Sequence, residues 1–232
     1  MNTRQPDFCK SCDIIEFIDG ENAEGIQLAN LFTSNGVKYI IKYACDYPSI
    51  DSLFADFTSC VLKRNNDARQ NSEPLYMPEL HLSCHGCEQG IGWPDGSLIS
   101  WSTLAKYLWQ LSHHLGYVTS PSVSGAFAQT TSLLSLSLSC CSGAHAKEHF
   151  FSSEPYPVAG FMAPTDTIYI SDCSQFFLRL YTLQIENPWD VKEKVDRIQK
   201  DFMPQGPNGS ASIQCFNAPL SPNLNYKPPL EI

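Results

Sequence analysis

Short apolar segments alternate with amphipathic segments along most of the chain, and this alternation constrains the fold more than any single motif. The segments typical of buried strands are "DIIEFID", "VKYIIKYAC", "PELHLSCHG", "SLLSLSLSCCSG" and "VAGFMAP". Between two of them, Leu104, Leu108, Leu111 and Leu115 repeat at the spacing of one helix face. Strands that alternate with helices build a mostly parallel sheet with helices on its faces. The sequence therefore predicts an α/β domain with a mostly parallel central sheet.

Caps and turn residues set the boundaries of the expected elements. Ser49 is a credible N-cap for a helix with apolar residues from Ile50 to Val61, and Arg64 belongs to its last turn. The polar stretch "NNDARQNSEP" that follows is predicted to be a turn, and "GIGWPDGSLIS" a small hairpin. The segment 117–132 and the stretch "AHAKEHFFSSEPYP" are expected to be irregular.

The C-terminal tail differs in composition from the rest of the chain. A helical pattern runs through 188–202, after which Pro, Asn and Gly dominate. We expect an N-terminal extension over 1–12, the α/β domain over 13–185, and a C-terminal helix and Pro-rich extension over 186–232 that packs on or near the domain. The helix offers a surface for a partner, or it packs on its own domain.

Charge and hydropathy argue against two classes of partner. The formal net charge is −9, and Lys and Arg form no stripe, so the basic surface expected of a nucleic-acid-binding protein is missing. The longest apolar run, "SLLSLSLSCC", is too short and too rich in serine to span a bilayer. The N-terminus shows no basic-then-apolar signal pattern. We therefore expect a cytoplasmic protein that binds neither nucleic acid nor membrane.

Ten cysteines are scattered along the chain, and most are expected to be reduced thiols. Two pairs, Cys9 with Cys12 and Cys84 with Cys87, have the C-x-x-C spacing of zinc sites. The pairs are far apart in the sequence, and a strand end would point Cys84 and Cys87 in different directions. Structural zinc remains an alternative, but the prediction is that no metal or cofactor is required.

Two of the predicted strands end in residues that can perform chemistry. His85 and Gly86 follow "LHLSC", and Cys141 and Gly143 follow "LSLSC". The carboxyl ends of parallel strands meet at one edge of a sheet, where functional groups gather. An imidazole beside a thiol activates it as a nucleophile, and glycines let backbone amides approach a developing oxyanion. This arrangement is typical of nucleophilic catalysis by cysteine.

The order of these motifs resembles that of caspase-like cysteine peptidases. In that group a strand ending in His-Gly is followed by a hairpin, a helix and a strand ending in small-Cys-x-Gly, as in "LHLSCHG" and "LSLSCCSG". The chain is most similar to the CHAT peptidases, because "VAGFMAPTDTIYISDCSQFFLRLYTL" follows their layout of a short strand, an xP-x-D segment and an aromatic-rich helix. The resemblance covers about residues 13–185 and implies a three-layer α/β sandwich.

The resemblance also implies roles for individual residues. His85 matches the general base and Cys141 the nucleophile, while the amides of Gly86 and Cys141 match the oxyanion hole. Cys140 remains an alternative nucleophile, although the motif favours the cysteine that has a small residue before it and a glycine two residues after it. For a single cysteine or histidine, a buried thiol or a satisfied polar group is the more common explanation.

Other polar residues near the motifs are weaker candidates. His145 and His149 follow the nucleophile closely, but such neighbours on a loop are more often solvated surface residues. Asp19 and Glu21 follow the first strand, where caspase-like enzymes draw part of the S1 pocket, and Asp166 follows the last core strand. We expect Asp19 or Asp166 to meet a basic substrate residue, although acidic loops are usually plain solvated surface.

The function predicted from these residues is that of a cytoplasmic cysteine endopeptidase, a regulated effector that cleaves a protein substrate through the pair His85 and Cys141. A regulatory or activating protein partner is expected, because related domains are commonly fused to sensor repeats and this sequence shows none. The alternative is a non-catalytic caspase-like interaction module or pseudoenzyme, in which the same fold only binds partners.

Overall fold

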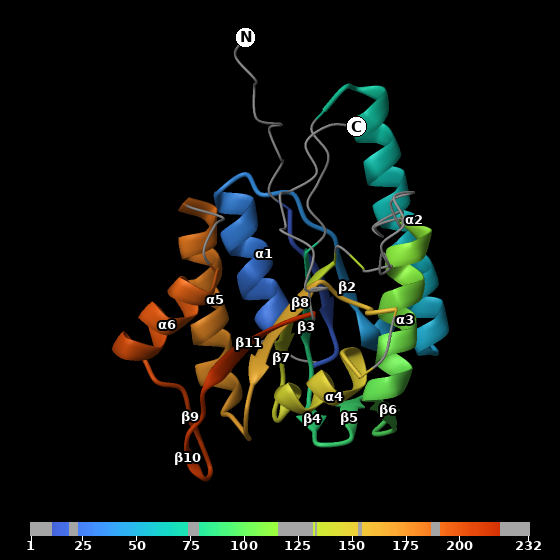
Figure 1. The fold of residues 1–232 in the computed structure, drawn as a ribbon. Coiled ribbons are helices and arrows are strands. Elements are labelled where there is room, and N and C mark those ends of the chain that lie inside the picture. Colours follow the sequence, from blue (N-terminus) through green and yellow to red (C-terminus); the bar gives the residue numbers. More distant parts are fainter. Residues whose placement is uncertain are drawn as a thin grey trace, which may run out of the picture.

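The computed structural model describes residues 11–18, 23–73, 79–115, 132, 134–152, 155–186 and 191–218. Figure 1 shows a central sheet with helices on both of its faces. The chain is a mixed α/β protein with a mostly parallel sheet and, among the described residues, six α-helices. This arrangement confirms the predicted class and is compatible with a three-layer sandwich.

The central sheet has six strands in the order β11-β8-β7-β3-β1-β2. Five strands run parallel to one another. Only β11, at the edge beside β8, runs antiparallel to them. The candidate motifs follow β3 and β7, which are adjacent central strands. The strands are β1 (Asp13–Glu16), β2 (Ile41–Tyr43), β3 (Glu79–Ser83), β7 (Ser135–Ser139), β8 (Gly160–Pro164) and β11 (Ile213–Asn217).

Helices form a layer on each face of the sheet (Figure 1). One layer contains α1 (Glu24–Ser34), α5 (Ile170–Glu186) and α6 (Val191–Asp201). The other contains α2 (Ile50–Gln70), α3 (Trp101–His114) and the short helix α4 (Ala146–Phe150). Each layer has its own apolar core against the sheet. The two short 3₁₀ turns are η1 (Ala44–Asp46) and η2 (Gly143–His145).

Alternation along β3 and β7 separates the two cores chemically. Leu80, Leu82, Leu136 and Leu138 are buried in the core shared with α2 and α3. Successive strand residues point to opposite faces, so the intervening His81 and the serines of β7 face the layer of α1 and α5. Each fully buried leucine contributes about 1.5–3 kcal/mol relative to an exposed one. The Ser-Leu alternation therefore gives one apolar face and one polar, buried face.

Two small antiparallel sheets accompany the main one. The predicted hairpin is confirmed: β5 (Gly90–Gly92) pairs with β6 (Leu98–Ser100), and β4 (Gly86–Cys87) adds a third strand. Gly96 has φ +87° in the turn, a conformation that favours glycine. The second small sheet pairs β9 (Gln205–Gly206) with β10 (Gly209–Ser210).

Several predicted boundaries were wrong. Helix α2 does not end near Arg64 but continues to Gln70, because Asn65 and Ala68 extend its buried face beyond Val61. "AHAKEHFFSSEPYP" was expected to be irregular but contains α4, whose Ala146 and Phe150 are buried. Strand β2 is limited to three residues, since the chain turns into η1 directly after it. Strand β11 was not predicted from the Pro-rich tail.

Helix α6 packs its apolar side onto its own domain. Val195 and Ile198 are buried in the core shared with α5, and the side chain of Gln199 bonds both the N–H and the C=O of Ile213 in β11. The guanidinium of Arg179 lies 4.6 Å from the centre of the Phe202 ring. This side of the helix is therefore not available to a partner.

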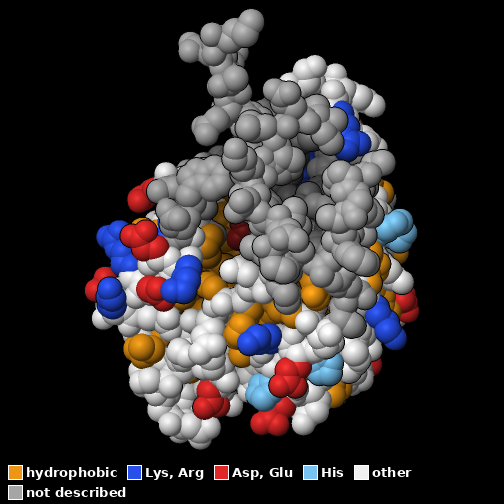
Figure 2. All heavy atoms as spheres, viewed as in Figure 1, with side chains coloured by type: hydrophobic (Ala, Val, Ile, Leu, Met, Phe, Trp, Pro, Cys, Tyr) orange, Lys and Arg blue, Asp and Glu red, His pale blue; other side chains and the backbone are white. Residues whose placement is uncertain are grey.

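The surface carries both signs of charge. In the view of Figure 2, Lys and Arg side chains are scattered among Asp and Glu and form no continuous basic patch on that face. Within the described part of the chain, no helix has the length and apolar character needed to cross a bilayer.

Candidate active site

Strand pairing brings the two predicted motifs to the same edge of the sheet. Ser83 of β3 is paired with Ser139 of β7, and the pairing continues one residue further, where the Cys84 N–H donates to the Ser139 carbonyl at 3.0 Å. His85 and Cys141 each lie two residues beyond the last paired serine of their strand. The structure therefore places the two side chains at adjacent strand ends.

Both residues line a single pocket at these strand ends. The pocket encloses about 270 Å³ of empty space, part of it open to solvent. Its walls come from the ends of β1, β3 and β7, from the start of α1, and from the first turn of α5 with the segment before it. The described lining residues are Ile18, Glu24, Cys84, His85, Ser139, Cys140, Cys141, Ile168, Ile170 and Cys173.

The surroundings of His85 hold its backbone and leave its ring accessible. The His85 carbonyl accepts a hydrogen bond from the Gly92 N–H at 2.8 Å, which ties the strand end to β5 of the hairpin. The side chain itself is exposed. An imidazole on a braced backbone with an open ring is suited to transfer protons to and from a bound substrate.

The two neighbouring cysteines have different environments. Cys140 is only 3% exposed, and a hydrogen bond with Cys84, together with burial, raises the pKa of its thiol well above the usual value. Cys141 is partly exposed, and its thiol donates to the Ile168 carbonyl at 3.5 Å. The thiolate is the reactive form of cysteine, so the buried and protonated Cys140 is the poorer nucleophile. This difference favours Cys141.

Gly86 and Gly143 are required by the protein's own packing. A Cβ atom at Gly86 would lie 2.4 Å from the Cys141 carbonyl oxygen, and one at Gly143 would lie 3.0 Å from the Cys140 Sγ. Any larger residue would push the strand ends apart. The close approach of Gly86 to Cys141 shows that the two proposed oxyanion-hole residues are neighbours, while the binding of an oxyanion by their amides stays a prediction.

The turn after Cys141 is tightly held. Ser142 has φ +55°, in the left-handed region that non-glycine residues seldom adopt. Its N–H donates to the Asp166 carbonyl at 3.0 Å, and its carbonyl accepts from the His145 N–H at 3.1 Å. These bonds fix the direction in which the chain leaves Cys141. Left-handed backbone of this kind is often found at functional turns.

The acidic residues predicted for substrate binding fall in different places. Asp166 is exposed, and its carboxylate accepts a hydrogen bond from the Thr167 N–H at 2.6 Å. It is absent from the described pocket lining, although its backbone holds the turn after Cys141. Asp19 and Glu21 lie outside the described residues. His145 and His149 are exposed on η2 and α4 and are likewise absent from the described lining.

Glu24 is a pocket residue that sequence reasoning missed. The Glu16 carboxylate accepts hydrogen bonds from the N–H groups of Ile18 (3.0 Å) and Gly25 (2.7 Å), which ties the end of β1 to the start of α1. This connection directs Glu24, 2% exposed, toward the strand ends. Its position just after a strand and before a helical pattern was the available signal.

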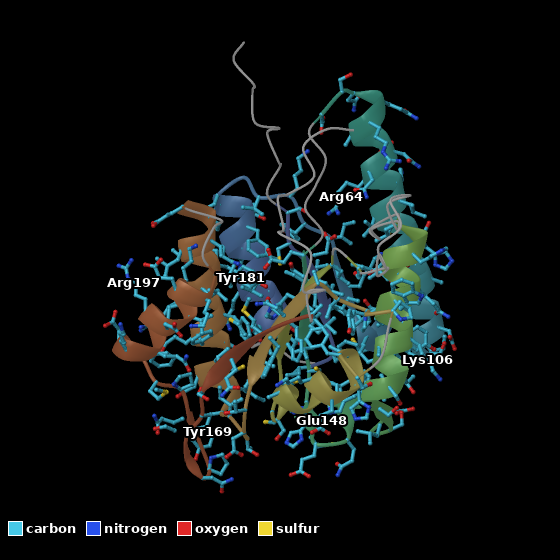
Figure 3. The ribbon with its side chains drawn as sticks, viewed as in Figure 1. Arg64, Lys106, Glu148, Tyr169, Tyr181 and Arg197 are labelled. Carbon is cyan, nitrogen blue, oxygen red and sulfur yellow. The ribbon has the colours of Figure 1, made fainter. Side chains whose placement is uncertain are left out.

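A buried polar network lies directly beneath the pocket. The Ser139 hydroxyl donates to the Glu24 carboxylate and lies 3.1 Å from the Cys173 Sγ. The Tyr181 hydroxyl donates to the Ser137 hydroxyl at 3.0 Å and lies 3.2 Å from the His81 Nδ1. Figure 3 labels Tyr181 on α5, beside the sheet. The polar face of the Ser-Leu alternation is thus bonded internally.

Cys9 lies outside the described residues, and the other member of its C-x-x-C pair, Cys12, is separated from Cys84 by the length of the sheet. Cys12 precedes Asp13, which pairs with Leu80 at the start of β3, whereas Cys84 follows the end of β3. At about 3.3 Å per strand residue, Cys12 and Cys84 are roughly 15 Å apart, too far to bind one zinc ion. Among the described residues, no group of three His, Cys, Asp or Glu side chains is arranged to hold a metal.

Comparison with known proteins adds no family assignment. No protein-family model matches the sequence, and no curated protein matches it either. The geometry of the strand-end pocket is therefore the basis on which a function is proposed.

Proposed function

We propose that the protein is a cysteine endopeptidase with a caspase-like fold of the CHAT type, in which Cys141 is the nucleophile and His85 the general base. The observation that carries the proposal is that the ends of β3 and β7 bring these two side chains into one pocket. The order of strand, hairpin, helix and strand between them supports the resemblance noted in the sequence.

The proposed reaction uses the two residues in turn. The Cys141 sulfur attacks the carbonyl carbon of a peptide bond while His85 accepts the thiol proton. His85 then donates this proton to the departing amine, and an acyl-enzyme forms on Cys141. A water molecule, deprotonated by His85, hydrolyses the thioester and restores the thiol. The amides of Gly86 and Cys141 are proposed to bind the oxyanion in both steps.

The thiol contact with Ile168 supports the idea of a regulated enzyme. In the structure the Cys141 thiol donates to the Ile168 carbonyl, so its proton is directed at the backbone. A rotation of this side chain toward His85 is needed before the proton can be transferred. Small movements of this kind can switch an active site, and a regulatory protein partner is proposed to cause this one.

The same contact is the observation that favours the alternative function. A thiol bonded to a backbone carbonyl fits a non-catalytic interaction module in which Cys141 is only a structural residue. The exposed His85 and the pocket between the strand ends are the features that this alternative leaves without a role.

Replacing Cys141 by Ala tests the proposal, with Cys140→Ala as the matched control on the adjacent residue. Cleavage products are compared for the wild type and both variants, with either the proteins of a cell lysate or a peptide library as substrate. Lysate is present in every reaction so that it can supply the proposed activating partner. We expect Cys141→Ala to lose at least about 10³-fold in activity, whereas Cys140→Ala keeps most of it. Equal activity of the wild type and Cys141→Ala would exclude the peptidase mechanism and leave the interaction module.

The pocket also bears on substrate choice. Among its described lining residues there is no Lys or Arg, and Glu24 supplies a carboxylate. We propose that the substrate residue before the cleaved bond is basic or small and polar, with Asp19 or Asp166 in contact with it. A peptide library that varies this residue measures the preference. Efficient cleavage after Asp would contradict the proposal.

A further inference from the structure

Cys84 and Cys140 occupy equivalent positions on two adjacent strands. Each follows the last paired serine of its strand, and the Cys84 N–H bonds the carbonyl of Ser139. Side chains at equivalent positions of neighbouring parallel strands project from the same face of the sheet. Both side chains belong to the same apolar cluster, and both line the same pocket at the strand ends.

This arrangement satisfies the main geometric condition for a disulfide. Neighbouring strands are about 4.8 Å apart, whereas disulfides join Cα atoms about 4.4–6.8 Å apart. The Cβ atoms of adjacent strands are somewhat farther apart than the usual disulfide separation of about 3.8 Å, so closure requires a small rotation. Disulfides under strain are the ones that are easily reduced.

The two thiols are buried but can be reached from the pocket. Each residue is 3% exposed, yet both line the pocket that contains His85 and Cys141. The pocket is partly open to solvent, so a small oxidant such as a hydroperoxide can enter it.

We propose that Cys84 and Cys140 form a reversible disulfide when the protein meets hydrogen peroxide, and that this bond switches the strand-end pocket. Neither residue has a role in the proposed peptide hydrolysis. Their positions, one residue before His85 and one before Cys141, place the new bond across the two strand ends.

The chemistry requires one equivalent of peroxide for each disulfide. The Cys84 sulfur attacks one peroxide oxygen, the O–O bond breaks, and the thiol proton passes to the departing hydroxide, so Cys84 becomes a sulfenic acid and one water leaves. The Cys140 sulfur then attacks the sulfenic sulfur, and its proton leaves with the hydroxyl as a second water. Two thiols are oxidised and the peroxide is reduced to two water molecules. Cys84 is assigned the first attack because the raised pKa of the Cys140 thiol makes Cys140 the poorer nucleophile.

The new bond alters the surroundings of the proposed nucleophile. Without the disulfide, the Cys140 Sγ lies close to the positions that a Cβ atom would occupy at Gly86 and at Gly143. Drawing this sulfur toward Cys84 moves the backbone of the residue that precedes Cys141, so the oxidised pocket should bind substrate less well. Formation of the disulfide does not rest on the proposed function, whereas its effect on hydrolysis does.

Intact mass and peptide mapping test the bond itself. The full-length reduced protein is treated with hydrogen peroxide, blocked with an alkylating reagent and digested. We expect the mass loss of two hydrogen atoms and a cross-linked peptide containing Cys84 and Cys140, both reversed by a dithiol reductant. Cys84→Ser should abolish the cross-link, whereas Cys87→Ser, the matched control on the neighbouring strand β4, should retain it. A bond between other cysteines, or oxidation of Cys141 alone, would overturn the proposal.

A second measurement separates the effect on activity from the bond. If the wild type hydrolyses peptides, oxidation should lower its rate at least about 10-fold, and reduction should restore it. The Cys84→Ser variant should lose this reversible response. A disulfide that forms without changing an active enzyme would contradict the switch, whereas a protein without hydrolysis under any condition would contradict the proposed function and leave the disulfide result intact.

Discussion

Strand β3 carries one histidine in its interior and a second just past its end, and the two have opposite environments. His81 is 0% exposed, with its Nδ1 at 3.2 Å from the Tyr181 hydroxyl and its Nε2 at 3.5 Å from a Glu24 carboxylate oxygen. Its ring packs edge-on against Phe177. His85, four residues later, is exposed and lines the pocket beside Cys141.

Histidine therefore has a structural role at His81 and a proposed functional role at His85. A buried polar group needs partners from the protein, since an unpaired one costs about 1–3 kcal/mol. His81 has a hydrogen-bond partner in the Tyr181 hydroxyl, and the Glu24 carboxylate lies 3.5 Å from its Nε2. A group that serves a substrate must instead keep a side open for it. The hydrogen-bonded backbone of His85, combined with its exposed ring, meets that second condition.

Replacing His85 by Ala should have the largest effect on activity and almost none on stability. We expect hydrolysis to fall by at least about 10³-fold, because His85 is the proposed acceptor of the thiol proton, while an exposed side chain contributes within about 0.5 kcal/mol to folding. Peptide cleavage and urea unfolding of the same preparation measure the two quantities.

The matched control for His85 is His149→Ala, an exposed imidazole on α4 that lies outside the described lining of the pocket. It should leave both activity and stability close to those of the wild type. Loss of stability in His85→Ala comparable to a core substitution would show that both histidines of β3 are structural, and the comparison would fail.

Replacing His81 by Ala should have the next largest effect, but this effect is on stability and not on activity. The change removes a fully buried ring and leaves the Tyr181 hydroxyl and the Glu24 carboxylate without that neighbour. We expect the free energy of unfolding to fall by about 2–4 kcal/mol, the sum of a cavity and a lost polar contact. Urea unfolding measures the loss.

A conservative variant helps to interpret this loss. In Tyr181→Phe the ring stays, and only the hydroxyl that donates to Ser137 is removed. Its cost should be smaller, about 1 kcal/mol. If His81→Ala were as stable as the wild type, the buried network would not hold the sheet to α5, and His81 would need another explanation.

The alternation in the sequence was enough to predict the sheet and the position of both strand ends. Leu80 and Leu82, like Leu136 and Leu138, mark one buried face of each strand, and burial confirms them. The same pattern cannot distinguish His81 from His85, because each histidine follows a residue of the buried apolar face, Leu80 in one case and Cys84 in the other. What distinguishes them is the layer above the sheet, which Tyr181 and Glu24 provide from distant parts of the chain.

Other features depended on contacts that the sequence does not show locally. Helix α2 runs to Gln70 through a polar stretch, partly because Arg64 binds the buried Asp13 of β1 at 2.5 and 2.9 Å. Strand β11 follows turn residues in a Pro-rich tail, and its pairing with β8 makes it a strand of the central sheet. Glu24 becomes a pocket residue because Glu16 binds the start of α1. Each is a long-range interaction that overrides local preference.

Glu79, two residues before His81, extends the comparison to a third position on β3, where the predicted effect is smaller than at His81. Burial raises the pKa of its carboxyl to about 7, an effect that His81 and Gln184 partly oppose. The folded state therefore holds this proton to higher pH than the unfolded state, whose carboxyl titrates near its ordinary value of about 4.3. The contribution of Glu79 to stability is fully present below that ordinary pKa and is lost as the pH rises to about 7.

Replacing Glu79 by Gln removes this titration and should retain a polar contact with Gln184. Each pKa unit corresponds to about 1.4 kcal/mol, and partial solvation of the side chain reduces the effect, so the variant should gain about 1–2 kcal/mol over the wild type between pH 4.5 and pH 8. Urea unfolding across this range measures the difference, and Glu148→Gln, at an exposed position of α4, is the matched control for the change of charge. Parallel pH profiles for Glu79→Gln and the wild type would show that β3 is solvated at its start as well as past its end. In that case only the middle of β3 would be buried, and the burial of His81 would follow from its position beneath α5.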